Sequence, residues 1–104
     1  TLALAGNKLF HLPVAVCSLT ALEELDVASN QLTELPESVA ALRSLRRLSL
    51  CNNSLSHLPE AVGSLTALEQ LDARMNRLTQ LPGWVSRLQS LKMLELHGNM
   101  LSRL

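Results

Sequence analysis

The chain has 104 residues, nine acidic and nine basic side chains, and only 2% aromatic residues, so its core must be aliphatic and no basic excess favours nucleic acid or an anionic membrane. Apolar residues make up 47% of the sequence, which excludes a disordered chain, and 26 positions are leucine. Without a run of 18 apolar residues or an N-terminal signal peptide, the sequence predicts a folded unit that binds neither membrane nor nucleic acid.

A 23-residue period runs through the whole chain. Columns of leucine that begin at Leu2 and Leu9, and a column of proline that begins at Pro13, repeat at this spacing. The clearest marker is a column of asparagines at Asn7, Asn30, Asn53, Asn76 and Asn99. Because the spacing never slips, we expect residues 1–104 to form about 4.5 structural repeats of 23 residues.

Each repeat combines a strand pattern with a helix pattern, as residues 22–44 illustrate. Leu25 and Val27 alternate with polar residues, which predicts a half-buried strand over 24–28. The next apolar side chains follow at i, i+4 and i+7, the period of a helix face: Leu35, Val39 and Leu42. Pro36 lies between the two patterns and suits the first position of a helical turn. In chain order, each repeat therefore predicts a strand, a turn and a short helical turn that runs back.

The repeat LxxLxLxxNxLxxLPxxhxxLxx, where h is apolar, resembles the leucine-rich repeat family over the entire chain. The resemblance implies an α/β solenoid, or horseshoe, with parallel strands on the concave face and short helical turns on the convex face. The Leu-Pro form at 23 residues is similar to the intracellular class of Ras-pathway and cell-polarity scaffolds. That likeness implies a cytoplasmic scaffold in signal transduction, with a protein partner such as a small GTPase or a phosphatase.

The asparagine column is expected to be structural. A side-chain amide both donates and accepts hydrogen bonds, so each asparagine can pair with backbone groups where the chain leaves the strand. A single repeat cannot bury its leucines alone, and stacking of neighbouring repeats makes a continuous core.

Both ends of the chain lie inside a repeat. Thr1 begins within a strand pattern, and Leu104 stops before the next proline is due. Neither end carries the polar outer face that caps a solenoid. We therefore expect either a segment of a longer protein or ends that associate with another copy of the chain.

Side chains of a strand alternate between its two faces, so the polar residues of successive strands should form columns on the concave face. The first column contains Glu24, Arg47, Gln70 and Met93. The middle column contains Ala3, Asp26, Ser49, Asp72 and Glu95. The third column contains Ala5, Ala28, Cys51, Arg74 and His97. A fourth, where the chain leaves each strand, contains Gly6, Ser29, Asn52, Met75 and Gly98.

The middle column is acidic and has no base, so it can accept Arg or Lys side chains from a partner. The large residues of the third column, Arg74 and His97, lie towards the C-terminus, and we expect that half of the face to supply most of the binding energy. The alternative is a solvated surface without a dedicated partner. The residues expected to contact a partner are Asp26, Arg47, Asp72, Arg74, Met75, Arg77, Met93, Glu95 and His97.

A further column flanks the strands and alternates in charge. It contains Glu23, Arg46, Glu69 and Lys92. Adjacent strands would place these opposite charges side by side. The pattern therefore predicts a self-neutralising ladder that favours correct stacking rather than a binding surface.

Three single residues depart from the repeat. Trp84 occupies a convex position where other repeats carry alanine or serine, and we expect it to be partly exposed, either as a contact for a second partner or as a ring over neighbouring aliphatic side chains. Phe10 lies at a turn and is expected to pack locally. Ala73 breaks an inward column of leucine and valine, so either a neighbouring side chain such as Met93 fills the space or the coil narrows there.

The sequence offers no catalytic, metal-binding or cofactor-binding constellation. His11 and His57 are two repeats apart, roughly 10 Å at strand spacing, which is too far for one metal ion. Cys51 and His97 are also two strands apart, beyond the reach of a nucleophile and its base. Cys17 is expected on the convex face, away from Cys51, so reduced thiols and a cytoplasmic location fit best. We therefore expect a non-enzymatic protein without cofactors.

These features favour a binding module that docks a protein partner on its concave strand face. A first alternative is the substrate-recognition arm of a larger enzyme, such as a kinase, a phosphatase or a ubiquitin ligase, whose catalytic domain lies in flanking sequence. A second alternative is a fragment of a receptor ectodomain, which the glycosylation triplet Asn52-Asn53-Ser54 would suit.

Overall fold

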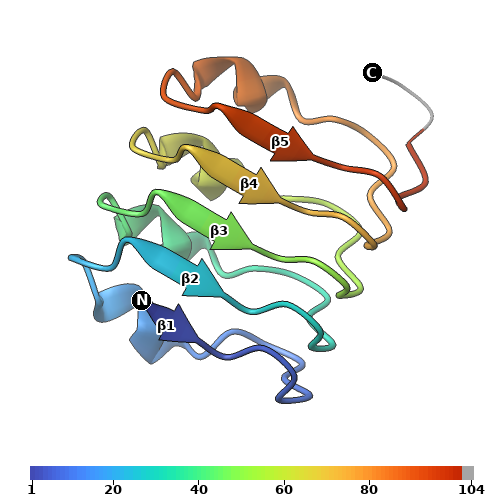
Figure 1. The fold of residues 1–104 in the computed structure, drawn as a ribbon, viewed down its shortest axis with the longest axis horizontal. Helices are drawn as coiled ribbons and strands as arrows, with labels where there is room; N and C mark the ends of the chain where they lie inside the picture. Colours follow the sequence, from blue (N-terminus) through green and yellow to red (C-terminus); the bar gives the residue numbers. More distant parts are fainter. Residues whose placement is uncertain (102–104) are drawn as a thin grey trace.

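In residues 1–101, which the computed structural model describes, five short parallel strands form one sheet, and four helical turns all lie on the same side of it (Figure 1). The strands are β1 (Leu2–Ala3), β2 (Glu24–Asp26), β3 (Arg47–Ser49), β4 (Gln70–Asp72) and β5 (Met93–Glu95). The helical turns are η1 (Val14–Ser18), η2 (Glu37–Ala41), η3 (Glu60–Ser64) and η4 (Gly83–Arg87). This arrangement confirms the predicted α/β solenoid.

The strands pair in a register of 23 residues. Leu25 of β2 lies opposite Leu2 of β1 and Leu48 of β3, and the order of strands in the sheet is their order in the chain. The backbone ladder continues beyond Asp26, because Val27 N–H donates to the Ser49 carbonyl at 3.0 Å. Residues 23 apart in the sequence are therefore lateral neighbours in the sheet, about 4.8 Å apart.

The chain leaves the strands through residues with left-handed backbone conformation. These residues are Gly6, Ser29, Asn52, Met75 and Gly98, with φ between 57° and 77°. Glycine adopts this conformation without penalty and asparagine tolerates it, whereas for methionine it is unfavourable. The sharp bend turns the next side chain, the asparagine of each repeat, under the strand ends.

The asparagine side chains connect adjacent coils by hydrogen bonds to the backbone. Asn53 Oδ1 accepts from the Leu32 N–H at 3.1 Å, and Asn53 Nδ2 donates to the carbonyls of Val27 and Leu50 at 3.1 and 3.0 Å. Asn30 and Asn76 are buried like Asn53 and make the equivalent bonds. Among the described residues, no buried side-chain nitrogen or oxygen lacks a partner. The column thus satisfies the backbone where neither strand nor helix does so.

The helical turns are 3₁₀ helices, in which each N–H bonds three residues back. Pro36 precedes η2 in an extended conformation (φ −71°, ψ 148°), and its carbonyl accepts from the Val39 N–H at 3.1 Å. The helix therefore begins one residue after the proline, not at the proline as predicted. A tight 3₁₀ turn suits coils stacked at strand spacing, because an α-helix with its side chains is about 10 Å across.

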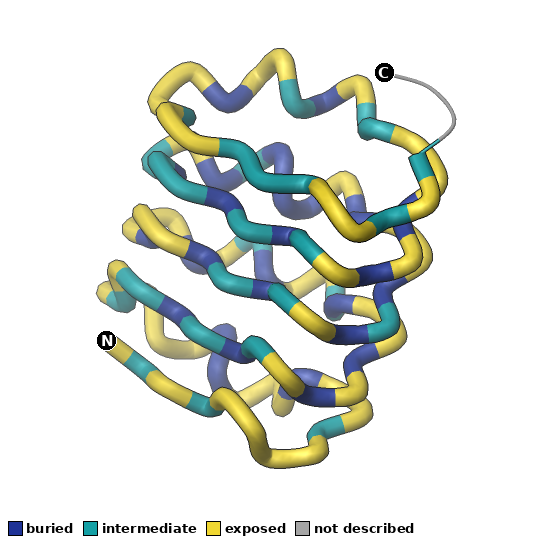
Figure 2. The backbone as a smooth tube through the Cα atoms, turned by 45° about the vertical axis from the view of Figure 1, so that its right-hand side comes forward, coloured by how far each residue is buried: buried dark blue, intermediate teal, exposed yellow. Residues whose placement is uncertain are grey.

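The core is a stack of leucines and valines between the sheet and the helical turns, and Figure 2 shows the buried positions recurring in every coil. Leu25, Leu48 and Leu71 form one such row, each at most 2% exposed. Ala73 is fully buried, whereas Met93 is 48% exposed, so Met93 does not fill the space next to Ala73.

Trp84 is buried, with 9% of its surface exposed, so the expectation of a partly exposed ring was wrong. The reason lies in the preceding coil, where Gly63 leaves room: a Cβ on Gly63 would lie 2.9 Å from Trp84 Cβ. Ala61, the residue equivalent to Trp84, is buried in the same place. Trp84 is therefore a core residue and offers no convex contact for a partner.

Phe10 is 62% exposed, so the prediction that it packs locally was also wrong. Its equivalents in the next three repeats are Thr33, Ser56 and Thr79, which are all exposed. The position faces outwards whatever residue occupies it. None of the helices in residues 1–101 is long and apolar enough to cross a membrane.

Candidate functional site

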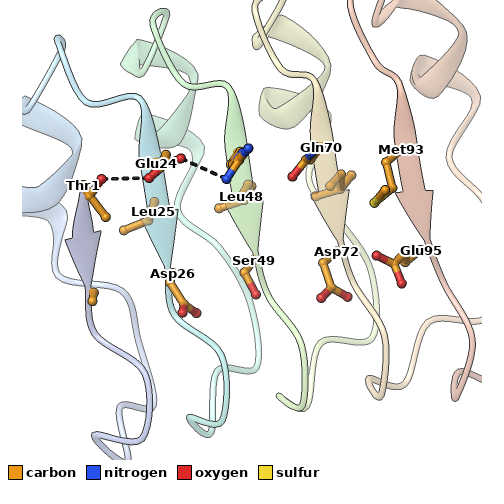
Figure 3. Close-up of a pocket in the computed structure, with 13 residues that line it drawn as sticks. Thr1, Glu24, Leu25, Asp26, Leu48, Ser49, Gln70, Asp72, Met93 and Glu95 are labelled. Atoms are coloured by element: carbon orange, nitrogen blue, oxygen red, sulfur yellow. Dashed lines mark hydrogen bonds and ion pairs between the residues drawn. The ribbon is translucent and has the colours of Figure 1, made fainter.

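The strand face carries a groove of about 330 Å³ that crosses all five strands (Figure 3). Two rows of side chains, polar or small except for Met93, line it above three core leucines. The lining residues are Thr1, Ala3, Glu24, Leu25, Asp26, Arg47, Leu48, Ser49, Gln70, Leu71, Asp72, Met93 and Glu95. We call this feature the strand-face groove.

The 23-residue register produces the two rows of the strand-face groove. Thr1, just before β1, and the first residues of β2 to β5 form the first row, and residues two positions later form the second, since alternate side chains of a strand share a face. The first row runs from Thr1 to Met93, and the second runs from Ala3 to Glu95. Both rows were predicted as columns from the sequence.

Charges in the first row compensate each other. Arg47 Nη1 lies 3.2 Å from Glu24 Oε2, and the Thr1 hydroxyl donates to Glu24 Oε1 at 2.8 Å. Figure 3 shows this chain of contacts between neighbouring strands. The remaining members, Gln70 and Met93, carry no charge. This row therefore offers hydrogen-bonding and apolar contact but little net field.

Asp72 in the second row holds Arg74 by a two-pronged ion pair. Arg74 Nε and Nη2 donate to Asp72 Oδ1 and Oδ2 at 2.8 and 2.7 Å, and the Arg74 backbone N–H donates to Oδ1 at 3.1 Å. Glu95 Oε2 lies 3.5 Å from Arg74 Nε. The hydrogen bond from the Arg74 side chain holds the pKa of Asp72 below its ordinary value. Arg74 is thus fixed between two carboxylates of its own chain.

Asp26 has the same backbone contact as Asp72 but no cation. Asp26 Oδ1 accepts from the Ala28 N–H at 3.0 Å, as Asp72 Oδ1 does from Arg74. Ala28 occupies the position that Arg74 occupies two strands later, so the residue that pairs with Asp72 has no charged counterpart at Asp26. None of the ion pairs within residues 1–101 includes Asp26.

The strand-face groove unites some of the residues that the sequence nominated for partner contact and leaves others outside. Asp26, Arg47, Asp72, Met93 and Glu95 line it. Arg74 adjoins it through Asp72. The other three nominated residues are exposed but do not line the groove: Met75, Arg77 and His97.

Sequence reasoning missed several lining residues. Thr1 lines the groove but was absent from the predicted columns. Glu24, Ser49 and Gln70 were placed in the predicted columns but were not among the residues expected to contact a partner. The three leucines that reach its floor were assigned only to the core. The 23-residue register is the signal that could have identified Thr1, because it lies 23 positions before Glu24 and hydrogen-bonds to it.

The flanking charge ladder is confirmed. Arg46 lies 3.7 Å from Glu23 and 3.0 Å from Glu69, and Lys92 lies 3.8 Å from Glu69. The hydrogen bond from Arg46 lowers the pKa of Glu69. These charges therefore pair with one another along the edge of the sheet.

No arrangement for metal binding was found in residues 1–101, where no three His, Cys, Asp or Glu side chains could hold an ion together. Cys17 is buried and Cys51 half-buried, and both are free thiols. Burial raises the pKa of the Cys51 thiol, which keeps it protonated and a weak nucleophile. The chemistry available at the strand-face groove is recognition by shape, hydrogen bonds and charge.

The sequence matches the profile of the family described as leucine rich repeat over residues 1–55, 21–78 and 43–101. Among solved structures, a leucine-rich-repeat protein of Leptospira interrogans is 40% identical with a TM-score of 0.94, covering 97% of this chain and 26% of that protein. An internalin of Listeria monocytogenes is 27% identical with a TM-score of 0.76, covering 86% of this chain and 25% of that protein.

A third similar structure is the leucine-rich-repeat ectodomain of the Arabidopsis receptor kinase HAESA in complex with an N-terminally extended IDA peptide hormone. It is 30% identical with a TM-score of 0.72, and the match covers 86% of this chain and 16% of that one. The chain thus spans about a quarter or less of each of these proteins.

Proposed function

Because the chain belongs to the leucine-rich repeat family, we propose that it is a protein-binding module that docks a polypeptide partner in the strand-face groove. Leucine-rich repeat domains are in general protein-interaction modules. The observation that carries the proposal is the groove itself, which combines apolar floor, hydrogen-bonding side chains and uncompensated charge on one face. The peptide complex of the similar HAESA ectodomain supports a polypeptide as the ligand.

The geometry of the groove suits a chain segment better than a small metabolite. It extends across five strands, roughly 20 Å at strand spacing, and is open along its length. Small-molecule sites instead enclose most of the ligand surface. Its half-buried polar side chains, among them Ser49 and Gln70, can pair with the backbone of an extended partner.

A non-enzymatic scaffold role in cytoplasmic signalling is the finer form of the proposal, with a small GTPase or a phosphatase as partner. It is supported by the resemblance of the Leu-Pro repeat to intracellular scaffolds and by two free cysteines. A recognition arm of a larger enzyme would use the same groove on a substrate.

The receptor-ectodomain alternative draws support from the HAESA ectodomain and from the exposed Asn52 in its glycosylation triplet. The two settings differ in one measurable property, the glycan. If the parent protein is an ectodomain, its mass should fall on treatment with peptide N-glycosidase, and Asn52→Gln should abolish that change. A mass unaffected by the enzyme favours the cytoplasmic setting.

Selection from a random linear peptide library displayed on phage tests the proposed function. Ser49→Arg fills the centre of the groove, and Ser38→Arg adds the same side chain on the exposed convex face. We expect peptides enriched on the unmodified chain to lose binding to Ser49→Arg and to keep it with Ser38→Arg. Enriched peptides that bind both variants equally would refute the groove as the docking site.

A further inference from the structure

The strand-face groove is acidic although the protein is neutral. Four carboxylates line it, from Glu24, Asp26, Asp72 and Glu95. Among the residues that the structure describes, two guanidinium groups pair with them, that of Arg47 in the groove and that of Arg74 beside it. The compensating bases of the whole chain lie elsewhere, so the excess negative charge is concentrated where a partner would dock.

The uncompensated charge falls at two places. Arg47 neutralises Glu24 at 3.2 Å, and Arg74 is shared between Asp72 at 2.7 Å and Glu95 at 3.5 Å. One negative charge therefore remains at Asp26 on β2, and a second remains on the Asp72–Glu95 pair of β4 and β5. Between them lies Ser49, whose short side chain leaves the groove open.

The distance between these two negative charges determines how far apart two basic side chains of a ligand should lie. Asp26 is separated from the middle of the Asp72–Glu95 pair by two and a half strand intervals, or about 12 Å. An extended peptide advances about 3.3 Å per residue, so residues i and i+4 lie about 13 Å apart on the same side of the chain. Residues i and i+2 span only about 7 Å, which is too short.

We propose that the groove is specific for an extended cationic peptide segment that crosses the strands and carries two basic side chains four residues apart, one on Asp26 and one on the Asp72–Glu95 pair. This inference rests on the proposed function and names the chemistry of its partner. Arginine is the better base at the second position, since its planar fork can pair with both carboxylates. Asp26 is the residue that most sets specificity, because no cation within residues 1–101 forms an ion pair with it.

Fluorescence anisotropy with fluorescein-labelled, nine-residue serine–glycine peptides tests the proposal. One peptide carries arginine at its third and seventh positions, a second at its third and fifth, and a third carries glutamate at its third and seventh. Asp26→Asn removes the charge but keeps the oxygen that accepts the Ala28 N–H. Glu34→Gln, at an exposed turn, is the matched control because it changes the net charge equally away from the groove.

We expect the peptide with arginines four residues apart to bind about fivefold more tightly than the one with arginines two apart, the gain of one well-placed charge pair. Asp26→Asn should remove about the same factor, and Glu34→Gln should leave the affinity within twofold. Equal affinity of the two arginine peptides, or equal effects of the two variants, would overturn the proposal. Library peptides that need the groove but lack paired basic residues would overturn it while leaving the proposed function intact.

Discussion

Replacement of Asn53 by alanine tests the role of the asparagine column in holding the coils together. The variant leaves the Leu32 N–H without its side-chain partner. It also removes one of the two amide hydrogen bonds at the Val27 carbonyl, which keeps Asn30, and at the Leu50 carbonyl, which keeps Asn76. A buried group left without a hydrogen bond costs about 1–3 kcal/mol and each of the two other lost bonds about 0.5–1.5 kcal/mol, so the free energy of unfolding should fall by at least about 2 kcal/mol. That is a large fraction of the roughly 5–15 kcal/mol of a typical domain.

Asn7 provides the matched control for Asn53→Ala. It belongs to the same column but is exposed, and its Nδ2 donates mainly to the Leu4 carbonyl at 2.8 Å. Water can replace the amide there, so Asn7→Ala should cost about 1 kcal/mol or less. Urea unfolding followed by circular dichroism gives both values. Losses for the two variants within about 0.5 kcal/mol of each other would refute the reasoning that burial makes the column structural.

Three further predictions concern the core, the groove and the strand exits. Gly63→Val should destabilise the protein by about 1–3 kcal/mol in thermal unfolding, because the valine side chain would collide with Trp84. The control Gly83→Ala has open space around it and should be nearly neutral. Equal effects of the two variants would contradict the burial of Trp84. Arg74→Met should raise the pKa of Asp72 towards its ordinary value in a carboxyl NMR titration. The folded-state pKa of Asp72 is lowered, so its contribution to stability is present above the unfolded pKa of about 3.9 and is lost as the pH falls through the folded pKa. Arg74→Met should therefore lose less stability on acidification than the unmodified chain. An unchanged acid dependence of stability would count against the ion pair. Met75→Asn should raise the unfolding free energy by up to about 1 kcal/mol, because asparagine tolerates the φ of 59° and already occupies the equivalent position 52; a net loss would mean that Met75 packing outweighs its backbone strain.

The sequence period predicts most of the fold because a solenoid converts spacing along the chain into position in space. Residues 23 apart become neighbours in the sheet, so the rows that contain Asp26 and Arg47 follow directly from the alignment of repeats. The type of helix does not follow, since the spacing of Leu35, Val39 and Leu42 fits an α-helix face as well as the inward face of a 3₁₀ turn.

The parts that sequence reasoning missed depend on contacts between particular side chains. The burial of Trp84 requires the absent side chain of Gly63 in the preceding coil, which a repeat pattern does not weigh. The ion pair of Arg74 with Asp72 joins residues two apart on one strand face. Arg74, which the sequence predicts to contact a partner, therefore pairs with a carboxylate of its own chain. Asp26 can be identified as the unpaired carboxylate only once the ion pair between Arg74 and Asp72 is known.

Chemical-shift mapping by NMR tests most directly whether the strand-face groove is the docking site for a polypeptide. A library-selected peptide would be added to the ¹⁵N-labelled chain, and the shifted backbone amides would be placed on the fold. The largest shifts should lie in β2, β3 and β4 at the residues that line the groove. Shifts concentrated instead in η1 to η4, on the opposite face, would contradict the claim.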